Sequence, residues 1–239
     1  MIGVVVPAHD EEALIGDCLR ALLQCARDPA LDGEEVAIVV VLDRCTDRTG
    51  QIAAKAGVTC LQLTAGNVGM ARAAGFRMAL AMGARWIATT DADSTVPANW
   101  LSAQLAHACD AFCGVISVAD WHEYDHAVRE AFVATECMLD DHPHVHGANL
   151  GISAQAYALS GGFLPLRAHE DVAMVHTLER CGVTIARRPT PQVVTSARKH
   201  ARAVGGFSDY LRALEAEVRK SASAMGAAMI EAAGTPGEY

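Results

Sequence analysis

Two aspartates, Asp91 and Asp93, are the residues whose type and spacing most clearly suit chemistry. They follow the apolar run Trp86–Thr90 directly. In an extended chain residues i and i+2 point to the same side, so both carboxylates can face one cation or one polyhydroxyl ligand. Mg²⁺ and Mn²⁺ favour oxygen ligands, and Mg²⁺ usually combines one or two carboxylates with substrate phosphates. The alternative is an acidic loop that caps a helix starting near Pro97.

The first half of the chain alternates strand-like and helical segments, which must position these carboxylates. Strands are expected at Ile2–Val6, Val36–Leu42, Val58–Leu63 and Trp86–Thr90, with helices at Asp10–Ala26, Asp47–Gly57 and Val68–Gly83. Continuously apolar strands separated by helices predict an α/β fold with a mainly parallel sheet covered on both faces. Ligands of such sheets bind beyond the carboxyl ends of the strands, where this sequence has His9, Asp10, Asp43, Asp91 and Asp93.

The second half is less regular. We expect strands at Phe112–Val118 and near Val183–Ala186 and Gln192–Thr195, and helices at His122–Leu139, about Asp171–Cys181, and Phe207 to about Ala233. A glycine-rich passage, His146–Ile152, lies between them. No linker separates two domains, so the 239 residues are expected to form a single one.

Composition limits the function classes. The formal net charge of −9 argues against a general affinity for nucleic acid, which requires Lys and Arg. No apolar run approaches the length of a membrane span and no signal peptide is evident, so we expect a cytoplasmic protein, with peripheral membrane contact left open. The eight cysteines include no CxxC pair, which favours reduced thiols over disulfides or a zinc site.

Several segments, in order, resemble the motifs of family 2 glycosyltransferases with the GT-A fold. They are Val5–Glu12, Val41–Thr49, Asn67–Gly75, the D-x-D of Asp91–Asp93, Gly147–Asn149 and the E-D pair Glu170-Asp171. The resemblance implies a GT-A-like sheet with a helical C-terminal extension. It also implies a nucleotide-sugar-binding half at 1–110, an acceptor-side half at 111–200 and a helical tail at 201–239.

The resemblance also implies roles for residues that would bind the donor, a UDP- or GDP-sugar. Asp43 would accept hydrogen bonds from N–H groups of uracil or guanine, unless it is only a turn or cap residue. His9 could pack on the base, unless it is a strand-end histidine satisfied by the backbone. Arg72 would lie near the diphosphate, unless it is a solvated helix arginine. The full donor-side set is Pro7, His9, Glu11, Asn67, Asp43, Arg72, Asp91, Arg198 and Arg202.

For the reaction itself, the resemblance implies that Asp93 holds a divalent cation, Mn²⁺ or Mg²⁺, which assists departure of the nucleoside diphosphate. Asp91 would contact the ribose or the sugar. Asp171 would be the base that deprotonates the acceptor hydroxyl, with inversion and with Glu170 in support. The alternative is that Glu170 and Asp171 only stabilise the start of a helix. Gly147, Ala148 and Asn149 would lie on the acceptor side.

Two clusters allow more than one interpretation. Arg198-Lys199-His200-Ala201-Arg202, before two glycines, could close over the diphosphate, with His200 completing the metal shell, or could be a solvated basic face. His142-Pro143-His144-Val145-His146 invites a zinc interpretation, but no third ligand with conventional spacing is evident. An acceptor pocket or a polar strand is therefore favoured for these histidines.

Other whole-chain interpretations are a sugar-1-phosphate nucleotidyltransferase, which would need a glycine-rich phosphate loop after the first strand, and a non-catalytic nucleotide-sugar-binding protein. The P-loop motif and the G-x-G-x-x-G dinucleotide motif are both absent from the expected positions. The acceptor is open between a glycan, a lipid carrier and a small metabolite, and the long C-terminal helix could support a homodimer.

Overall fold

A seven-stranded sheet forms the centre of the protein. The computed structural model describes residues 1–136, 138–199 and 205–233. The strands lie in the order β3-β2-β1-β4-β6-β5-β7, and β6 runs antiparallel to both of its neighbours while the other pairs are parallel. This confirms the mainly parallel sheet. The strands are β1 (Ile2–Ala8), β2 (Val36–Asp43), β3 (Thr59–Leu63), β4 (Trp86–Thr89), β5 (Ala111–Val118), β6 (Leu150–Ser153) and β7 (Ile185–Thr195).

Helices cover both faces of the sheet. On one face α1 (Ile15–Cys25), α2 (Thr49–Lys55) and α4 (Trp100–Leu105) contribute to a single hydrophobic core. On the other, α3 (Val68–Ala81), α6 (Ala154–Ser160) and α7 (Glu170–Arg180) contribute to a second core. Two 3-10 turns, η1 (Pro29–Leu31) and η2 (Gly147–Asn149), complete this part of the fold.

The alternation of side chains along β1 explains its unbroken apolar sequence. Val4 and Val6 belong to the first core, whereas Val5, between them, belongs to the second. All three are at most 1% exposed. Because successive side chains of a strand point to opposite faces, a strand buried on both sides needs an apolar residue at every position.

The second half differs from the sequence-based expectations in several details. The two short strands expected near its end are one strand, β7, whose pairing with β5 shifts register between Gly114 and Ile116. This irregularity accommodates Pro189 and Pro191, which had interrupted the strand pattern. The helix expected over 122–139 covers only α5 (His126–Thr135), and α6 was not predicted.

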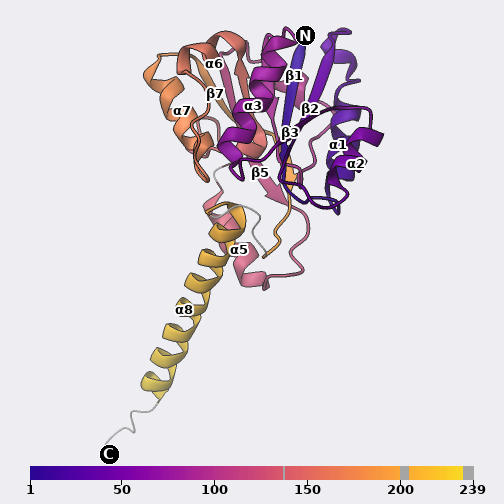
Figure 1. Ribbon diagram of the computed structural model, residues 1–239. Coiled ribbons are helices and arrows are strands. Elements are labelled where there is room, and N and C mark those ends of the chain that lie inside the picture. The colour runs from indigo at the N-terminus through magenta and orange to yellow at the C-terminus, as the bar shows by residue number, and fades with distance from the viewer. Residues whose placement is uncertain (137, 200–204, 234–239) are drawn as a thin grey trace, which may run out of the picture.

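The last helix, α8 (Phe207–Ala233), starts against α5 and then extends away from the sheet (Figure 1). Their contact is a third hydrophobic cluster that contains Phe132 and Leu211, with Phe207 packed against it. The helical C-terminal extension is thereby confirmed. Within the described part of the chain, no helix is both long and apolar enough to cross a membrane.

Close packing of α3 on the sheet yields a stability prediction. A Cβ added to Gly75 would lie 2.3 Å from Cγ1 of Val5 and 3.0 Å from Cγ2 of Val41. We expect Gly75→Ala to lower the free energy of unfolding by about 1–3 kcal/mol, because the buried strands must move to admit the methyl group. Urea denaturation would measure this.

The matched control is Gly16→Ala in α1, where the nearest atom to the added Cβ is 3.9 Å away. That substitution should leave the stability unchanged or raise it, since alanine favours helix. Equal effects of the two substitutions would contradict the packing described for α3.

Candidate active site

The loops after β1 and β2 are joined at the carboxyl end of the sheet. Asp10, whose φ is 51°, accepts hydrogen bonds from the N–H groups of Thr46 (2.6 Å) and Asp47 (3.2 Å). These bonds lower the pKa of Asp10, the Thr46 N–H having the largest effect. The Glu12 N–H in turn donates to Oδ2 of Asp47 at 2.9 Å. This interlocking explains why α1 begins at Ile15 and not at Asp10, as the sequence had suggested.

Asp43 and its neighbours form the next part of this edge. The buried carboxylate of Asp43 accepts from the N–H groups of Gly66 (2.9 Å) and Asn67 (2.8 Å). Nδ1 of the exposed His9 ring donates to the Asp43 carbonyl at 2.8 Å. Asn67 caps α3 by accepting from the Met70 N–H at 2.9 Å. The structure therefore brings His9, Asp43 and Asn67 together; their contact with a base remains a prediction.

Pro7 lies in the part of β1 that extends beyond the end of its neighbour β4. The pairing of β1 with β4 ends at Val5 and Thr89, whereas Pro7 is still in register with Val41 of β2. A proline, which has no N–H to donate, is therefore tolerated at this point of a central strand.

Arg72 is a buried link between three segments. Its Nη2 donates to Asp91 Oδ1 at 2.5 Å, its Nη1 forms a close ion pair with Glu170, and its side chain is 4% exposed. Gly147 packs so closely against the same guanidinium that an added Cβ would lie 2.5 Å from Nη2, which leaves no room for a side chain. The solvated-arginine interpretation is wrong, and Arg72 positions Asp91 and Glu170.

Arg198 joins the first loop to the D-x-D pair. Its two terminal nitrogens donate to Glu11, at 2.6 Å to Oε2 and 2.5 Å to Oε1. Nη2 also lies 3.1 Å from Asp93 Oδ2. The end of β7 contributes Thr195, whose hydroxyl accepts from Ser94 Oγ at 2.9 Å. Arg198 is thus in the site but pairs with carboxylates, and the neighbouring Lys199 forms an ion pair with Glu215 at 3.0 Å. The two other members predicted for the site, His200 and Arg202, lie outside the described residues.

The site has an excess of negative charge. Around Asp91 and Asp93 the described residues include the carboxylates of Glu11, Glu170 and Asp171, against the guanidinium groups of Arg72 and Arg198. Withdrawal from water raises the pKa values of Asp91 and Asp93, and the nearby guanidinium groups oppose that rise. An all-oxygen donor set with surplus charge fits a hard divalent cation.

Asp171 lies at the start of α7, beside the glycine-rich turn. Its Oδ2 accepts from the Gly147 N–H at 2.6 Å, and its Oδ1 accepts from the Val172 N–H at 2.8 Å. Each oxygen retains a lone pair for a further hydrogen bond. Because Glu170 is held by Arg72, both members of the E-D pair are fixed in place by neighbouring segments.

Asn149 has a different position from the one expected for an acceptor-side residue. It is fully buried, accepts from Trp100 Nε1 at 2.8 Å, and donates to the carbonyls of Val115 (2.9 Å) and Pro191 (2.8 Å). Its side chain therefore ties α4, β5 and β7 together beneath the turn. Ala148 is also buried, at 5% exposure.

A cluster of one carboxylate and two imidazoles near this turn was not predicted from the sequence. Glu136, which follows α5, offers a carboxylate oxygen within 4.8 Å of ring nitrogens of both His144 and His146. Burial raises the pKa of Glu136 to about 7 and lowers that of His146 to about 4. The H-x-H spacing was visible in the sequence, but nothing indicated that the end of a separate helix would supply a third group.

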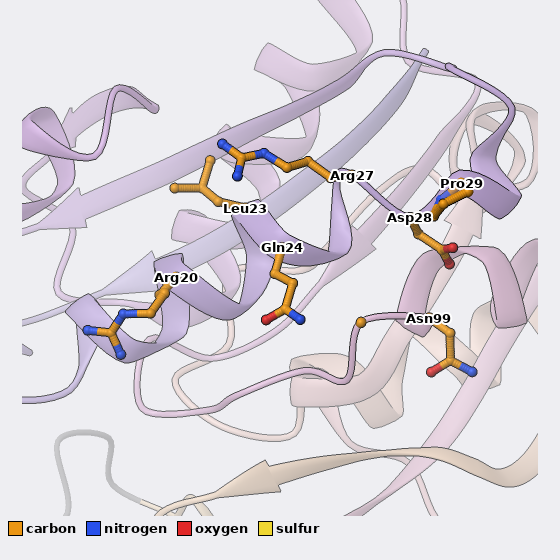
Figure 2. Close-up of a pocket in the computed structure, with 8 residues that line it drawn as sticks. Arg20, Leu23, Gln24, Arg27, Asp28, Pro29 and Asn99 are labelled. Carbon is orange, nitrogen blue, oxygen red and sulfur yellow. The ribbon is translucent and has the colours of Figure 1, made fainter.

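A groove elsewhere on the surface lies between the end of α1, with Arg20 in the helix and Arg27 just after it, and Asn99 before α4 (Figure 2). Since α1 runs from the carboxyl end of β1 back towards the start of β2, this groove lies at the amino ends of the strands. It is remote from the acidic site, and we assign it no role.

The buried position of Arg72 generates a prediction. Arg72→Met should lower the free energy of unfolding by about 3–5 kcal/mol, because it leaves the Glu170 carboxylate buried without its partner. Arg20→Met, at a pair with Asp17 in which the side chains are 76% and 63% exposed, should cost less than about 1 kcal/mol. Denaturant titration would compare them, and similar losses would refute the structural role of Arg72.

The overall structure is similar to solved glycosyltransferases. S. aureus TarS 1-349, solved with UDP-GlcNAc, matches with a TM-score of 0.65 at 16% identity, over 91% of this chain and 66% of that one. Mannosyltransferase PcManGT from Pyrobaculum calidifontis, solved with GDP-Man and Mn²⁺, matches with a TM-score of 0.60 at 19% identity, over 84% and 58%. The glucosyl-3-phosphoglycerate synthase of Mycobacterium tuberculosis, solved with Mn²⁺ and UDP, gives 0.52 at 17%, over 91% and 77%.

The present chain spans only 37% of the chain in one TarS structure and 61% in another, so these relatives contain further parts. No curated protein matches it in sequence. In a comparison with known protein families, residues 3–147, more than half of the chain, match Glycosyl transferase family 2. Taken with the sheet order and the acidic edge, this match shows that the chain belongs to glycosyl transferase family 2 and has the GT-A fold.

Proposed function

We propose that the protein is a metal-dependent transferase that moves a sugar from a UDP- or GDP-linked donor to an acceptor hydroxyl, with inversion at the anomeric carbon. The observation that carries this proposal is the link made by Arg72. It holds Asp91 of the D-x-D pair and Glu170, the neighbour of Asp171, on the same guanidinium. This link supports a site in which the groups proposed for the donor and for the acceptor lie close together, as direct transfer between two substrates requires.

The donor would bind along the loops after β1, β2 and β4. The exposed ring of His9 offers a surface for the base, and the carboxylate of Asp43 keeps lone pairs beyond those used by Gly66 and Asn67. Glu11 would act through its pairing with Arg198. The solved complexes of TarS with UDP-GlcNAc and of PcManGT with GDP-Man support a UDP- or GDP-sugar.

Asp93, with Asp91, would hold the divalent cation. Asp93 lies beside the hydroxyls of Ser94 and Thr195 and is 14% exposed, so its carboxylate can still be reached. When bound, such a cation neutralises the negative charge that develops on the departing nucleoside diphosphate. Mn²⁺ in the PcManGT complex supports a cation of this class.

Asp171 would accept the proton of the acceptor hydroxyl. The N–H groups of Gly147 and Val172 orient its carboxylate, and a base at this position would lie on the acceptor side of the donor. Direct attack by the deprotonated oxygen gives inversion. The acceptor classes to screen are glycans, lipid carriers and small metabolites.

Nucleotide binding can be tested without an acceptor. At about 100 times the dissociation constant, a nucleoside diphosphate should stabilise the native protein by about 2.7 kcal/mol, which is a rise in Tm of about 5–10 °C for a chain of this size. UDP, GDP, CDP and TDP would be compared with and without Mn²⁺. The shift should require Mn²⁺ and disappear in Asp93→Asn, but persist in Asp17→Asn, which changes an exposed carboxylate of α1. No metal-dependent shift with any diphosphate would reject the proposal.

Substitution of Asp171 tests its proposed role as the base. Asp171→Asn should reduce kcat for transfer, or for donor hydrolysis, by about 10²–10⁴-fold because no group then accepts the proton. The Mn²⁺-dependent thermal shift should be retained, since the donor site is unchanged. Loss of the shift together with activity would indicate a structural role for Asp171, and unchanged kcat would exclude it as the base.

A further inference from the structure

Glu136, His144 and His146 form a second cluster of possible metal ligands, separate from Asp91 and Asp93. Their ligand atoms all lie within 4.8 Å of one another, and each side chain is half-buried. None of the three belongs to the groups proposed for the donor or for proton transfer. Among the described residues this is the only such group of three or more His, Cys, Asp or Glu side chains.

Two atoms of the cluster lack hydrogen bonds. Oε2 of Glu136 and Nε2 of His146 are buried from solvent, and neither has a hydrogen-bond partner among the described residues. A buried polar atom without a partner is costly, so native proteins nearly always provide one. A carboxylate oxygen needs a proton donor or a cation, and so does His146 Nε2 in the tautomer that carries its proton on Nδ1. In that tautomer a single cation serves both atoms.

The segment that carries the histidines is held rigidly. Nη1 of Arg187, in β7, donates to the carbonyls of His142 (3.4 Å), Pro143 (3.4 Å) and His144 (3.3 Å). At the end of the segment, the Gly147 N–H donates to Asp171. These contacts fix the backbone on both sides of His146, so little order remains to be gained when a ligand binds.

Two imidazoles and one carboxylate are a donor set characteristic of Zn²⁺ sites that keep a fourth position open, whereas Mg²⁺ and Ca²⁺ prefer oxygen ligands alone. A tetrahedral ion with bonds of about 2.0–2.1 Å separates its ligand atoms by about 3.4 Å. The ligand atoms lie within 4.8 Å of one another, so side-chain rotations that move each atom by about an ångström bring them to this spacing.

We propose that Glu136, His144 and His146 bind a divalent transition-metal ion of the Zn²⁺ class, at a site distinct from that of the D-x-D cation. The ion links the end of α5 to the segment that leads into Gly147. The zinc interpretation of the histidines, disfavoured by the sequence for want of a third ligand, is restored by Glu136.

The test is equilibrium dialysis of the metal-stripped full-length chain against Zn²⁺ with excess Mg²⁺, followed by metal analysis. The wild type should retain one Zn²⁺ per chain. Glu136→Gln and His146→Ala should weaken binding by on the order of 100-fold, as expected when a metal site is impaired. The matched control is the double variant His126→Ala, Glu130→Gln, which removes an exposed His–Glu pair of α5, the helix that Glu136 follows. This variant should bind Zn²⁺ as the wild type does.

Co²⁺ substitution adds a spectroscopic measurement. A four-coordinate site with imidazole ligands should give intense visible absorption in the wild type, and this should be lost in Glu136→Gln, a nearly isosteric change that keeps the fold testable by its melting curve. Absence of Zn²⁺ in the wild type, or full retention in the folded variants, would overturn the proposal. The Mn²⁺-dependent shift with nucleoside diphosphates is measured separately, so failure here leaves the glycosyltransferase proposal standing.

Discussion

The site depends on the ion pairs that the buried guanidinium of Arg72 forms with Asp91 and Glu170. It belongs to α3, yet its partners are the carboxylates of Asp91, beyond β4, and Glu170, at the start of α7. A buried charge is tolerated only when its partners are correctly placed. The three segments must therefore assemble together, and the position of Asp171 relative to Asp93 is a consequence of that assembly. Gly147 is required for the same reason, since a side chain there would displace the guanidinium.

Arg198 makes a corresponding connection to the second carboxylate of the acidic pair, Asp93. By pairing with Glu11 and approaching Asp93, it joins the loop after β1 to the end of β7. Each arginine thus pairs with a different one of the two D-x-D carboxylates. Both arginines partly offset the mutual repulsion of the carboxylates around Asp91 and Asp93. The negative charge that is left still favours a cation.

The first half of the fold could be predicted because β1, β2 and β4 are largely apolar and buried, and because its helices end at glycines or turns. The irregular second half could not, since Pro189 and Pro191 lie inside β7 and the short helix α6 has no long periodic pattern. Asp43, Asp91 and Asp171 were predicted as site residues from the strands they follow and the motifs they resemble, and their roles stay predictions. The burial of Arg72 and Asn149, and the approach of Glu136 to the histidines, depend on contacts between distant segments that no local pattern specifies.

The two edge strands of the sheet, β3 and β7, determine whether copies of this chain can associate by strand addition. An exposed edge strand offers unpaired N–H and C=O groups to which another chain can add. At one edge, β3 is a short strand of five residues in which Cys60 and Gln62 are exposed. At the other, β7 carries Pro189 and Pro191, so it cannot present a regular ladder of N–H donors. The prolines that obscure this strand in the sequence thus also disfavour strand addition at this edge of the sheet.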